Sequence, residues 1–276
     1  MKFEVTKDNI FRTLSHIQGI VDKKNNLPIL SNILIEAKNN SITLTSTDMD
    51  ISIIEELQCN VIEEGSTTIN SQIFYDIVRK IEGDSNIEII SNNGKLLTLR
   101  ANGSRFSLAC LPKEEFPIID FKREESTIKI NSNIIFKLID KTKFAVSNEE
   151  TRYFLNGIYF NLHDEGNNSL VTFVATDGHR LAKFSHKLDQ KINPISGVIL
   201  PKKTINELSK LLADVNIDID IYLSSSKIIF YINNTILISK LIDGTFPDYN
   251  RVIPNNNDNK LIINRERLLS AVDRVS

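Results

Sequence analysis

The segment Thr176-Asp177-Gly178-His179-Arg180-Leu181 combines residue types that could do acid–base chemistry. On a strand, Asp177 and His179 would share one face, which would suit a general base oriented by a carboxylate. Nothing nearby supplies a nucleophile or a metal partner. Gly178 directly after Asp177 is typical of a turn. Thr47-Asp48 stands at the equivalent place in the first copy of an internal repeat, so we expect the Thr-Asp pair to form the same turn in both copies. An enzyme that uses Asp177, His179 and Arg180 is therefore the less favoured interpretation.

The two cysteines, Cys59 and Cys110, form no CxxC motif, and no histidine lies at metal-ligand spacing from them. Neither a disulfide framework nor a zinc site has support. We expect two reduced core cysteines and no metal or other cofactor. His16, His163 and His186 are expected to be ordinary surface or hydrogen-bonded residues.

The composition is that of a soluble globular protein, with 41% apolar and 25% charged residues among 276. This length suits about two domains of ordinary size. No apolar run approaches the roughly 18 residues that a membrane span needs. Glu4 and Asp8 interrupt the position where a secretory signal would be apolar. We expect a cytoplasmic protein.

The overall charge restricts how the chain could bind nucleic acid. Its formal net charge is −2 and its pI is about 6.1. Tight binding by bulk electrostatics needs many uncompensated Lys and Arg residues. Any role on DNA must therefore depend on something other than a strongly basic surface.

An internal repeat organises the chain. The trio Val5, Ile10 and Leu14 recurs 125 positions later and again 258 positions later, as Ile130, Ile135, Ile139 and as Ile263, Leu268, Val272. Further segments match in the same order: 29–35 with 154–160, 42–48 with 171–177, and 106–117 with 236–247. Three copies begin and two are completed.

Polar segments separate the copies at 121–126 and 254–260. We expect domain one at 1–125, domain two at 126–254 and the start of an incomplete third domain at 255–276. A lone strand and helix cannot bury a core, so we expect either a longer sequence or a partner that completes the third unit.

Each complete copy predicts the order strand, helix, several strands, helix and further strands. Apolar residues recur at helical spacing in two segments of each copy. These residues are Ile10, Phe11, Leu14, Ile17; Phe74, Ile77, Val78, Ile81; Ile135, Leu138, Ile139; and Ile205, Leu208, Leu212. Asn70 or Ser71 is a plausible helix cap. Alternating β-branched segments lie between the helices. The prediction is an α+β fold in which two helices of each copy pack on antiparallel sheet.

Basic residues lie off the apolar face of each predicted helix: Lys7, Arg12, Arg79, Lys80, Lys137, Lys141, Lys202, Lys203 and Lys210. On one helix this describes an ordinary solvated face. In a repeat, equivalent helices could form one basic wall that attracts a duplex locally. No base-reading motif is present, so sequence specificity is not expected.

Five segments resemble the bacterial sliding clamp family, the beta subunit of DNA polymerase III. They are Leu27–Leu30, Arg105–Leu108, Arg152–Gly157, Thr176–Ala182 and Asp243–Val252. The resemblance runs in order from Met1 to Ser276. It implies tandem clamp-type domains, each a pseudo-two-fold repeat, of which three form half of a closed homodimeric ring in full-length members.

The resemblance also implies three sets of site residues. A cleft for partner peptides with Gln, Leu and Phe anchors would include Leu155, Thr176, Gly178, His179, Arg180, Leu181, Pro247, Arg251 and Val252. Contacts to double-stranded DNA would fall at Lys24, Arg152, Tyr153, Lys202 and Lys203, with Glu149 in place of an expected neutral DNA-contacting residue. The homodimer contact would include Arg105, Phe106 and Leu108.

The resemblance implies a non-catalytic processivity factor. It would encircle duplex DNA and tether the DNA polymerase III catalytic subunit, the clamp loader, and other polymerases and repair proteins. A topological link needs little binding energy, which reconciles a pI of about 6.1 with a role on DNA. The alternatives are a peptide-binding adaptor without DNA contact and the enzyme described above.

Overall fold

The computed structural model describes residues 1–21, 27–92, 94–119, 128–166, 168–189, 191–192, 194–254 and 257–276. The chain forms two compact units, Met1–Gly244 and Thr245–Ser276. The first unit holds both β-rich copies of the repeat. The expected domain boundaries at 125 and 254 adjoin or fall within segments outside the described residues, so they stay predictions.

Copy one contains nine strands and two helices among its described residues. In chain order they are β1 (Lys2–Thr6), α1 (Lys7–Ile17), β2 (Asn32–Lys38), β3 (Ser41–Thr47), β4 (Ile51–Gln58), β5 (Asn60–Glu63), β6 (Gly65–Asn70), α2 (Ser71–Lys80), β7 (Asn86–Asn92), β8 (Leu96–Ala101) and β9 (Ser104–Ala109). Short 3-10 helices lie at Pro28–Ser31 and Lys113–Glu115.

Copy two repeats this order without a counterpart of β5 in its described part. Its elements are β10 (Ile128–Asn131), α3 (Ser132–Asp140), β11 (Gly157–Glu165), β12 (Asn168–Thr176), β13 (Leu181–Leu188), β14 (Ile195–Pro201), α4 (Lys202–Leu211), β15 (Asp218–Leu223), β16 (Lys227–Ile232) and β17 (Thr235–Lys240). Short 3-10 helices lie at Lys143–Ala145 and, as η4, at Glu150–Leu155.

The strands form three antiparallel sheets, and one of them spans both copies. Their orders are β5-β1-β7-β8-β9, β10-β15-β16-β17-β4-β3-β2-β6 and β13-β12-β11-β14. In the shared sheet, β17 of copy two pairs with β4 of copy one, with Leu237 opposite Ile53. Both of these residues are fully buried. The two copies are thus joined by backbone hydrogen bonds as well as by packing.

The helices form because each presents one apolar face to the sheets. Helix α1 buries Ile10, Leu14 and Ile17, and α2 buries Phe74 and Val78. Helices α3 and α4 bury the matching positions of copy two: Ile135, Leu138, Ile139, Ile205 and Leu208. These buried faces confirm the predicted α+β arrangement.

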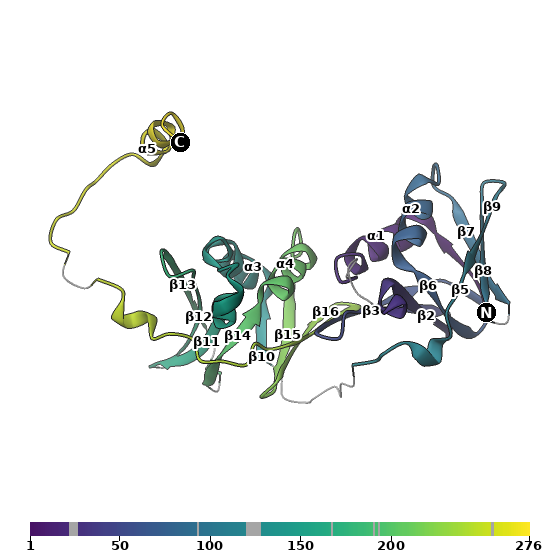
Figure 1. Cartoon of the computed structure of the whole chain (residues 1–276), viewed down its shortest axis with the longest axis horizontal. Coiled ribbons are helices and arrows are strands. Elements are labelled where there is room, and N and C mark those ends of the chain that lie inside the picture. Colours follow the sequence, from purple (N-terminus) through teal and green to yellow (C-terminus); the bar gives the residue numbers. More distant parts are fainter. Residues whose placement is uncertain are drawn as a thin grey trace. The chain divides into compact units, whose positions relative to one another are not determined.

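The four helices adjoin one another in the order α2, α1, α4, α3. Figure 1 shows them along one long side of the first unit, with the strands of the shared sheet on the other. The predicted cap of α2 is confirmed, since the Asn70 side chain accepts a hydrogen bond from the Ile73 amide at 3.0 Å. The repeat therefore places equivalent helices of both copies on a common side.

The strand expected at the start of copy three does not form. Residues 257–264 have no strand structure, and only α5 (Arg265–Asp273) follows, capped by Asn264. The counterpart strand β1 pairs with β5 and β7, which come later in copy one. Residues 261–276 of the repeat include no counterpart of those partners. Leu268, Leu269 and Val272 of α5 are accordingly exposed.

The cysteines lie at the margin of the core rather than inside it. Cys59 and Cys110 are free and half-buried and pack against the core cluster, where the sequence predicted reduced core cysteines. Burial raises the pKa of Cys59 to about 11 and also raises that of Cys110. Both shifts favour the protonated thiol over the thiolate.

Candidate functional site

The segment Thr176–Arg180 is a tight turn between β12 and β13. Thr176 Oγ1 donates to the Arg180 carbonyl at 2.7 Å and accepts from the Gly178 amide at 3.1 Å. Asp177 Oδ1 accepts from the amides of His179 and Arg180, each at 3.0 Å. Gly178 has a φ of +89°, which glycine adopts without strain. The strand that the acid–base interpretation assumed is absent from this described segment.

The counterpart Thr47–Ile51 in copy one has the same hydrogen bonds. Thr47 Oγ1 donates to the Ile51 carbonyl at 3.0 Å and accepts from the Met49 amide at 3.1 Å. Asp48 Oδ1 accepts from the amides of Asp50 and Ile51 at 2.9 and 2.8 Å. The Thr-Asp pair is thus turn chemistry shared by the repeat, as the sequence predicted.

The Asp177 carboxylate is committed to this turn. Backbone hydrogen bonds from His179 and Arg180, and then the Arg180 side chain, lower its pKa to about 2. So acidic a group is a poor general base at neutral pH. Among the described residues, no cluster of His, Cys, Asp and Glu could hold a metal ion either. The interpretation in which Asp177 acts as a general base loses its support.

Arg180, Leu181 and the neighbouring Phe144 form a surface that we call the outer side of this turn. Arg180 Nε lies 2.9 Å from Asp177 Oδ2, and its guanidinium lies 5.9 Å from the ring centre of the exposed Phe144. Leu181 is half-buried at the start of β13. The turn thus presents a cation beside apolar surface, which suits a peptide with both polar and apolar side chains.

Helix η4 contains candidates for both sites: Leu155 for the peptide site, and Arg152 and Tyr153 for DNA contact. Its last residue, Leu155, is only 3% exposed. Its Arg152 lies directly against Gly178, because a Cβ on that glycine would stand 2.7 Å from Arg152 Nη1. The sequence treated Arg152 only as a DNA contact. The contact of Arg152 with the turn could not be predicted from spacing, since Arg152 and Gly178 are 26 residues apart in the chain.

Glu149 holds Arg152 through an ion pair. Glu149 Oε2 accepts from Arg152 Nε at 2.7 Å and also from Nη2. The hydrogen bond from Arg152 is the main cause that lowers the pKa of Glu149. The carboxylate predicted to disturb DNA contact therefore neutralises the charge of a neighbouring DNA-contact candidate.

The other DNA-contact candidates differ in how far they are available. Lys202 Nζ donates to Asn148 Oδ1, and Lys203 Nζ donates to Asp48 Oδ2 and to the Ile20 carbonyl. Tyr153 is 55% exposed and packs edge-on against Phe154. Lys24 lies outside the described residues.

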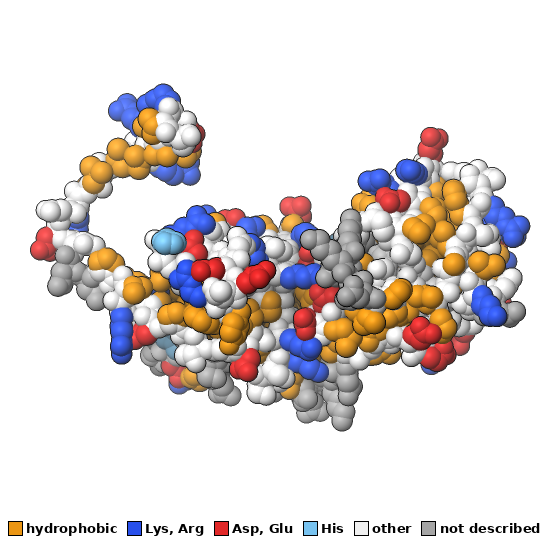
Figure 2. Space-filling view, viewed as in Figure 1, with side chains coloured by type: hydrophobic (Ala, Val, Ile, Leu, Met, Phe, Trp, Pro, Cys, Tyr) orange, Lys and Arg blue, Asp and Glu red, His pale blue; other side chains and the backbone are white. Residues whose placement is uncertain are grey.

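The predicted basic wall is less positive than the sequence suggested. Figure 2 shows Lys and Arg side chains interspersed with Asp and Glu over α3 and α4. Ion pairs within single helices, or just past their ends, explain this: Arg79 with Asp76, Lys141 with Asp140, and Lys210 with Glu207. Contact with phosphates along this side would be weak.

Pro247, Arg251 and Val252 belong to the second unit, Thr245–Ser276. Arg251 ends the short 3-10 helix η5 (Tyr249–Arg251), where its Nε lies 3.0 Å from Asp248 Oδ2. Pro247, Arg251 and Val252 are all exposed. Their membership of the peptide site stays a prediction.

Arg105, Phe106 and Leu108 lie on β9, the last strand of its sheet. Arg105 is exposed, whereas Phe106 and Leu108 are half-buried and pack against the core. Phe106 also lines a surface pocket of about 560 Å³ together with Ile73 and Ile77 of α2. An open edge beside exposed apolar side chains is typical of a surface that another strand or helix covers.

No helix in the described part of the chain combines the length and the apolar character that crossing a bilayer requires.

Comparison with known proteins gives one consistent result. Residues 1–120 match the family model described as DNA polymerase III beta subunit, N-terminal domain, and residues 129–248 match the central domain of the same subunit. A relative in Caulobacter vibrioides named "Beta sliding clamp" is 38% identical over 277 residues, which covers 100% of this chain and 74% of that protein. The relative of that name in Rickettsia bellii is 39% identical and is covered to 72% of its length.

Solved structures agree with this assignment. The sliding clamp of Bartonella birtlesii bound to griselimycin superposes with a TM-score of 0.92 at 38% identity, covering 99% of this chain and 74% of that one. The clamp of Bacillus subtilis superposes with a TM-score of 0.92 at 31% identity, covering 99% and 73%. The turn at Asp177, the edge strand β9 and the fold that holds them are thus features of a chain that belongs to the family of the DNA polymerase III beta subunit, the bacterial sliding clamps.

Proposed function

We propose that this protein acts as a DNA sliding clamp: a non-catalytic, cytoplasmic processivity factor that encircles duplex DNA as a homodimeric ring. In this role it holds the DNA polymerase III catalytic subunit, the clamp loader and other polymerases and repair proteins by short peptides. The observation that carries the proposal is that β17 of copy two pairs with β4 of copy one. Each of these strands has a counterpart in the other copy, and each counterpart is the last strand of its sheet.

The repeat matches β9 to β17 and β13 to β4. Strands β17 and β4 pair with each other, whereas β9 and β13 each end their sheet. Phe106 and Leu108 of β9 match Ile236 and Ile238 of β17, and Ile238 is fully buried opposite Ser52 of β4. Similar pairing at the two open edges would extend the series of copies in both directions. Such head-to-tail contacts close into a ring when the rotation permits.

The row α2, α1, α4, α3 would face the duplex. Its mixed charge and the net charge of −2 suit a surface that is not held tightly at any sequence. The proposed contacts are Lys24, Arg152, Tyr153, Lys202 and Lys203. A closed ring should remain on nicked circular DNA and be lost once that DNA is cut.

The proposed peptide site joins Leu155 and Leu181 to the outer side of the Thr176–Arg180 turn. Asp177 orients His179 and Arg180 by accepting their backbone hydrogen bonds, and Thr176 accepts from the Gly178 amide. Arg180 would offer donors while the leucines offer apolar contact, so a Gln followed by Leu and Phe anchors fits this chemistry. Pro247, Arg251 and Val252 complete the proposed set.

Two titrations on the present chain test this proposal against its alternatives. A fluorescent Gln/Leu/Phe peptide should bind, and a random duplex should bind weakly, with an affinity that falls as salt is added and after Lys202→Glu. Peptide binding without any salt-sensitive DNA binding would leave an adaptor. Turnover abolished by His179→Ala would support the enzyme instead.

A further inference from the structure

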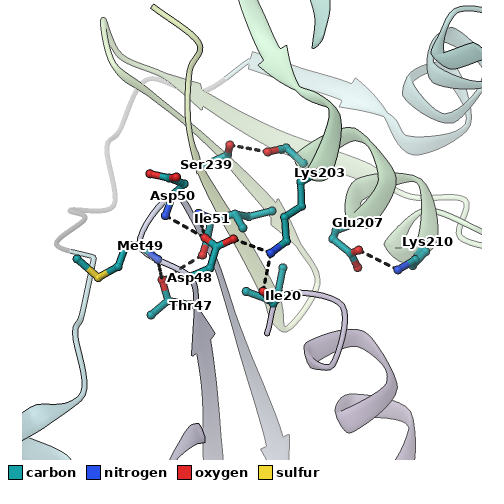
Figure 3. Close-up of polar contacts among 11 residues, drawn as sticks. Ile20, Thr47, Asp48, Met49, Asp50, Ile51, Lys203, Glu207, Lys210 and Ser239 are labelled. Atoms are coloured by element: carbon teal, nitrogen blue, oxygen red, sulfur yellow. Dashed lines mark hydrogen bonds and ion pairs between the residues drawn. The ribbon is translucent and has the colours of Figure 1, made fainter. Parts of the chain in front are cut away.

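Lys203 crosses from copy two to copy one. From the first turn of α4, its Nζ donates to Asp48 Oδ2 at 2.6 Å and to the Ile20 carbonyl at 2.7 Å. Figure 3 shows the side chain reaching between the turn that contains Asp48 and the segment that follows α1. The Asp48 side chain is only 12% exposed. A single ammonium therefore ties α4 to two separate elements of copy one.

Both acceptors are also held by contacts within copy one. Asp48 Oδ1 is occupied by the amides of Asp50 and Ile51, which leaves Oδ2 directed at the lysine. Ile20 is fully buried three residues after the last residue of α1. Its carbonyl, which lies past the end of α1, accepts from Lys203 Nζ. Copy one thus supplies a carboxylate and a carbonyl as acceptors, and copy two supplies the ammonium group that binds both.

Two further contacts bring α4 close to its neighbours. Gly19 has no side chain, and a Cβ there would stand 2.1 Å from Oε2 of the buried Glu207 on α4. Thr204 Oγ1 and Ser239 Oγ lie 2.6 Å apart and join α4 to β17. Strand β17 in turn pairs with β4. Helix α4 is therefore linked to copy one by two routes: directly through Lys203, and through β17 and the shared sheet.

The repeat shows that this use of lysine is specific to the junction. In copy two, the counterpart of Asp48 is Asp177, whose Oδ2 is satisfied locally by Arg180 Nε at 2.9 Å. The counterpart of Lys203 on α2 is Gln72, which bonds to Gln18 and Asp76 within copy one. Among the described residues, an ion pair connects such a helix to such a turn only at the junction between the two copies.

We propose that Lys203 is a positioning residue that fixes the angle between the two copies, through Asp48 and Ile20, rather than principally a phosphate contact. The lysine spans the place in the helix row where α4 of copy two adjoins α1 of copy one. The role concerns the geometry of the chain alone and does not depend on the proposed activity on DNA.

Distance measurement between spin labels tests this directly. Both cysteines are replaced by alanine, and labels are attached at Lys80→Cys on α2 and Asn133→Cys on α3, two exposed positions in different copies. Asp48→Asn and Lys203→Met should each broaden or shift the distance distribution measured by electron–electron double resonance. Lys203→Arg, which keeps a donor cation, should restore much of the original distribution.

Lys202→Met is the matched control, because it removes the neighbouring cation of α4 while leaving the junction intact. It should weaken DNA binding without altering the distance distribution. An unchanged distribution in both Asp48→Asn and Lys203→Met would overturn the proposal and leave Lys203 as a DNA contact.

A double-mutant cycle supplies a second, independent measurement. Each single variant should raise the unfolding equilibrium constant about tenfold, and the double variant should raise it little further, because the two residues share one interaction. Additive effects, about a hundredfold in the double variant, would show that Lys203 and Asp48 act separately and would contradict the proposal.

Discussion

The guanidinium of Arg152 lies against the backbone of Gly178, so that a Cβ on this glycine would stand 2.7 Å from Arg152 Nη1 and would displace it. Gly178 also has a φ of +89°. Replacement by alanine therefore adds two costs, one from the left-handed backbone and one from displacing Arg152.

We expect Gly178→Ala to lower the free energy of unfolding by about 1 kcal/mol through the backbone alone, and to weaken peptide binding because Arg152 and the turn both shift. Gly103→Ala is the control, since its φ is +75° and its added Cβ would meet nothing within 4 Å. Urea denaturation and peptide titration of both variants separate the costs. Equal peptide affinity in the two variants would remove Gly178 from the site.

Glu149→Gln should strengthen duplex binding. The substitution breaks the ion pair with Arg152 and returns a free guanidinium to the DNA-facing side. The slope of log affinity against log salt should grow steeper by about one, as expected for one additional phosphate contact. Glu150→Gln, which removes an adjacent exposed carboxylate, serves as the control for simple charge change. An unchanged slope in Glu149→Gln would mean that Arg152 does not reach phosphate.

Stability should depend on pH through Asp177. Its pKa is about 2 in the folded protein, against an ordinary value of 3.8. The folded state therefore prefers the ionised form, and this stabilisation is fully present above the ordinary value and is lost as pH falls toward 2. The difference in unfolding free energy between the parent and Asp177→Asn should shrink between pH 5 and pH 2. A difference independent of pH over that range would contradict the role of the carboxylate.

Met49 is the counterpart of Gly178 and has a φ of +80° without being glycine. Met49→Gly should relieve this strain and raise the free energy of unfolding by about 1 kcal/mol. The hydrogen bonds of Thr47 and Asp48 would remain, since they involve backbone amides. Thermal and urea unfolding provide the measurement. A destabilised variant would show that the exposed Met49 side chain contributes more than its backbone costs.

The repeat in the sequence predicted the elements well because its apolar positions recur at helical spacing, as at Ile10, Leu14 and Ile17. It also predicted the shared Thr-Asp turn. It could not show that β17 pairs with β4, because strand alternation indicates which face is buried but not which neighbour is paired. The two roles of Lys203 and Arg152 were missed for a related reason. Both depend on partners far away in the chain, and a basic residue on a helix is compatible with either solvent, DNA or a carboxylate.

Leu155 and Leu181 provide the most direct test of the peptide site. Each apolar anchor buried by the peptide should contribute about 1.5 to 3 kcal/mol. Leu155→Ala or Leu181→Asp should therefore weaken binding by roughly one to two decades, as measured by fluorescence anisotropy. Leu155 is only 3% exposed, so its loss will also destabilise the fold. Leu181 is half-buried and its variant separates binding from folding more cleanly.

The control is Leu96→Asp at the start of β8, where the leucine is 54% exposed. This variant introduces the same charge on copy one and should bind the peptide like the parent chain. Circular dichroism at the assay temperature establishes that each variant is folded. Because Leu181→Asp and Leu96→Asp differ only in position, unaltered affinity in a folded Leu181→Asp variant would exclude the outer side of the Asp177 turn as the place where partners bind.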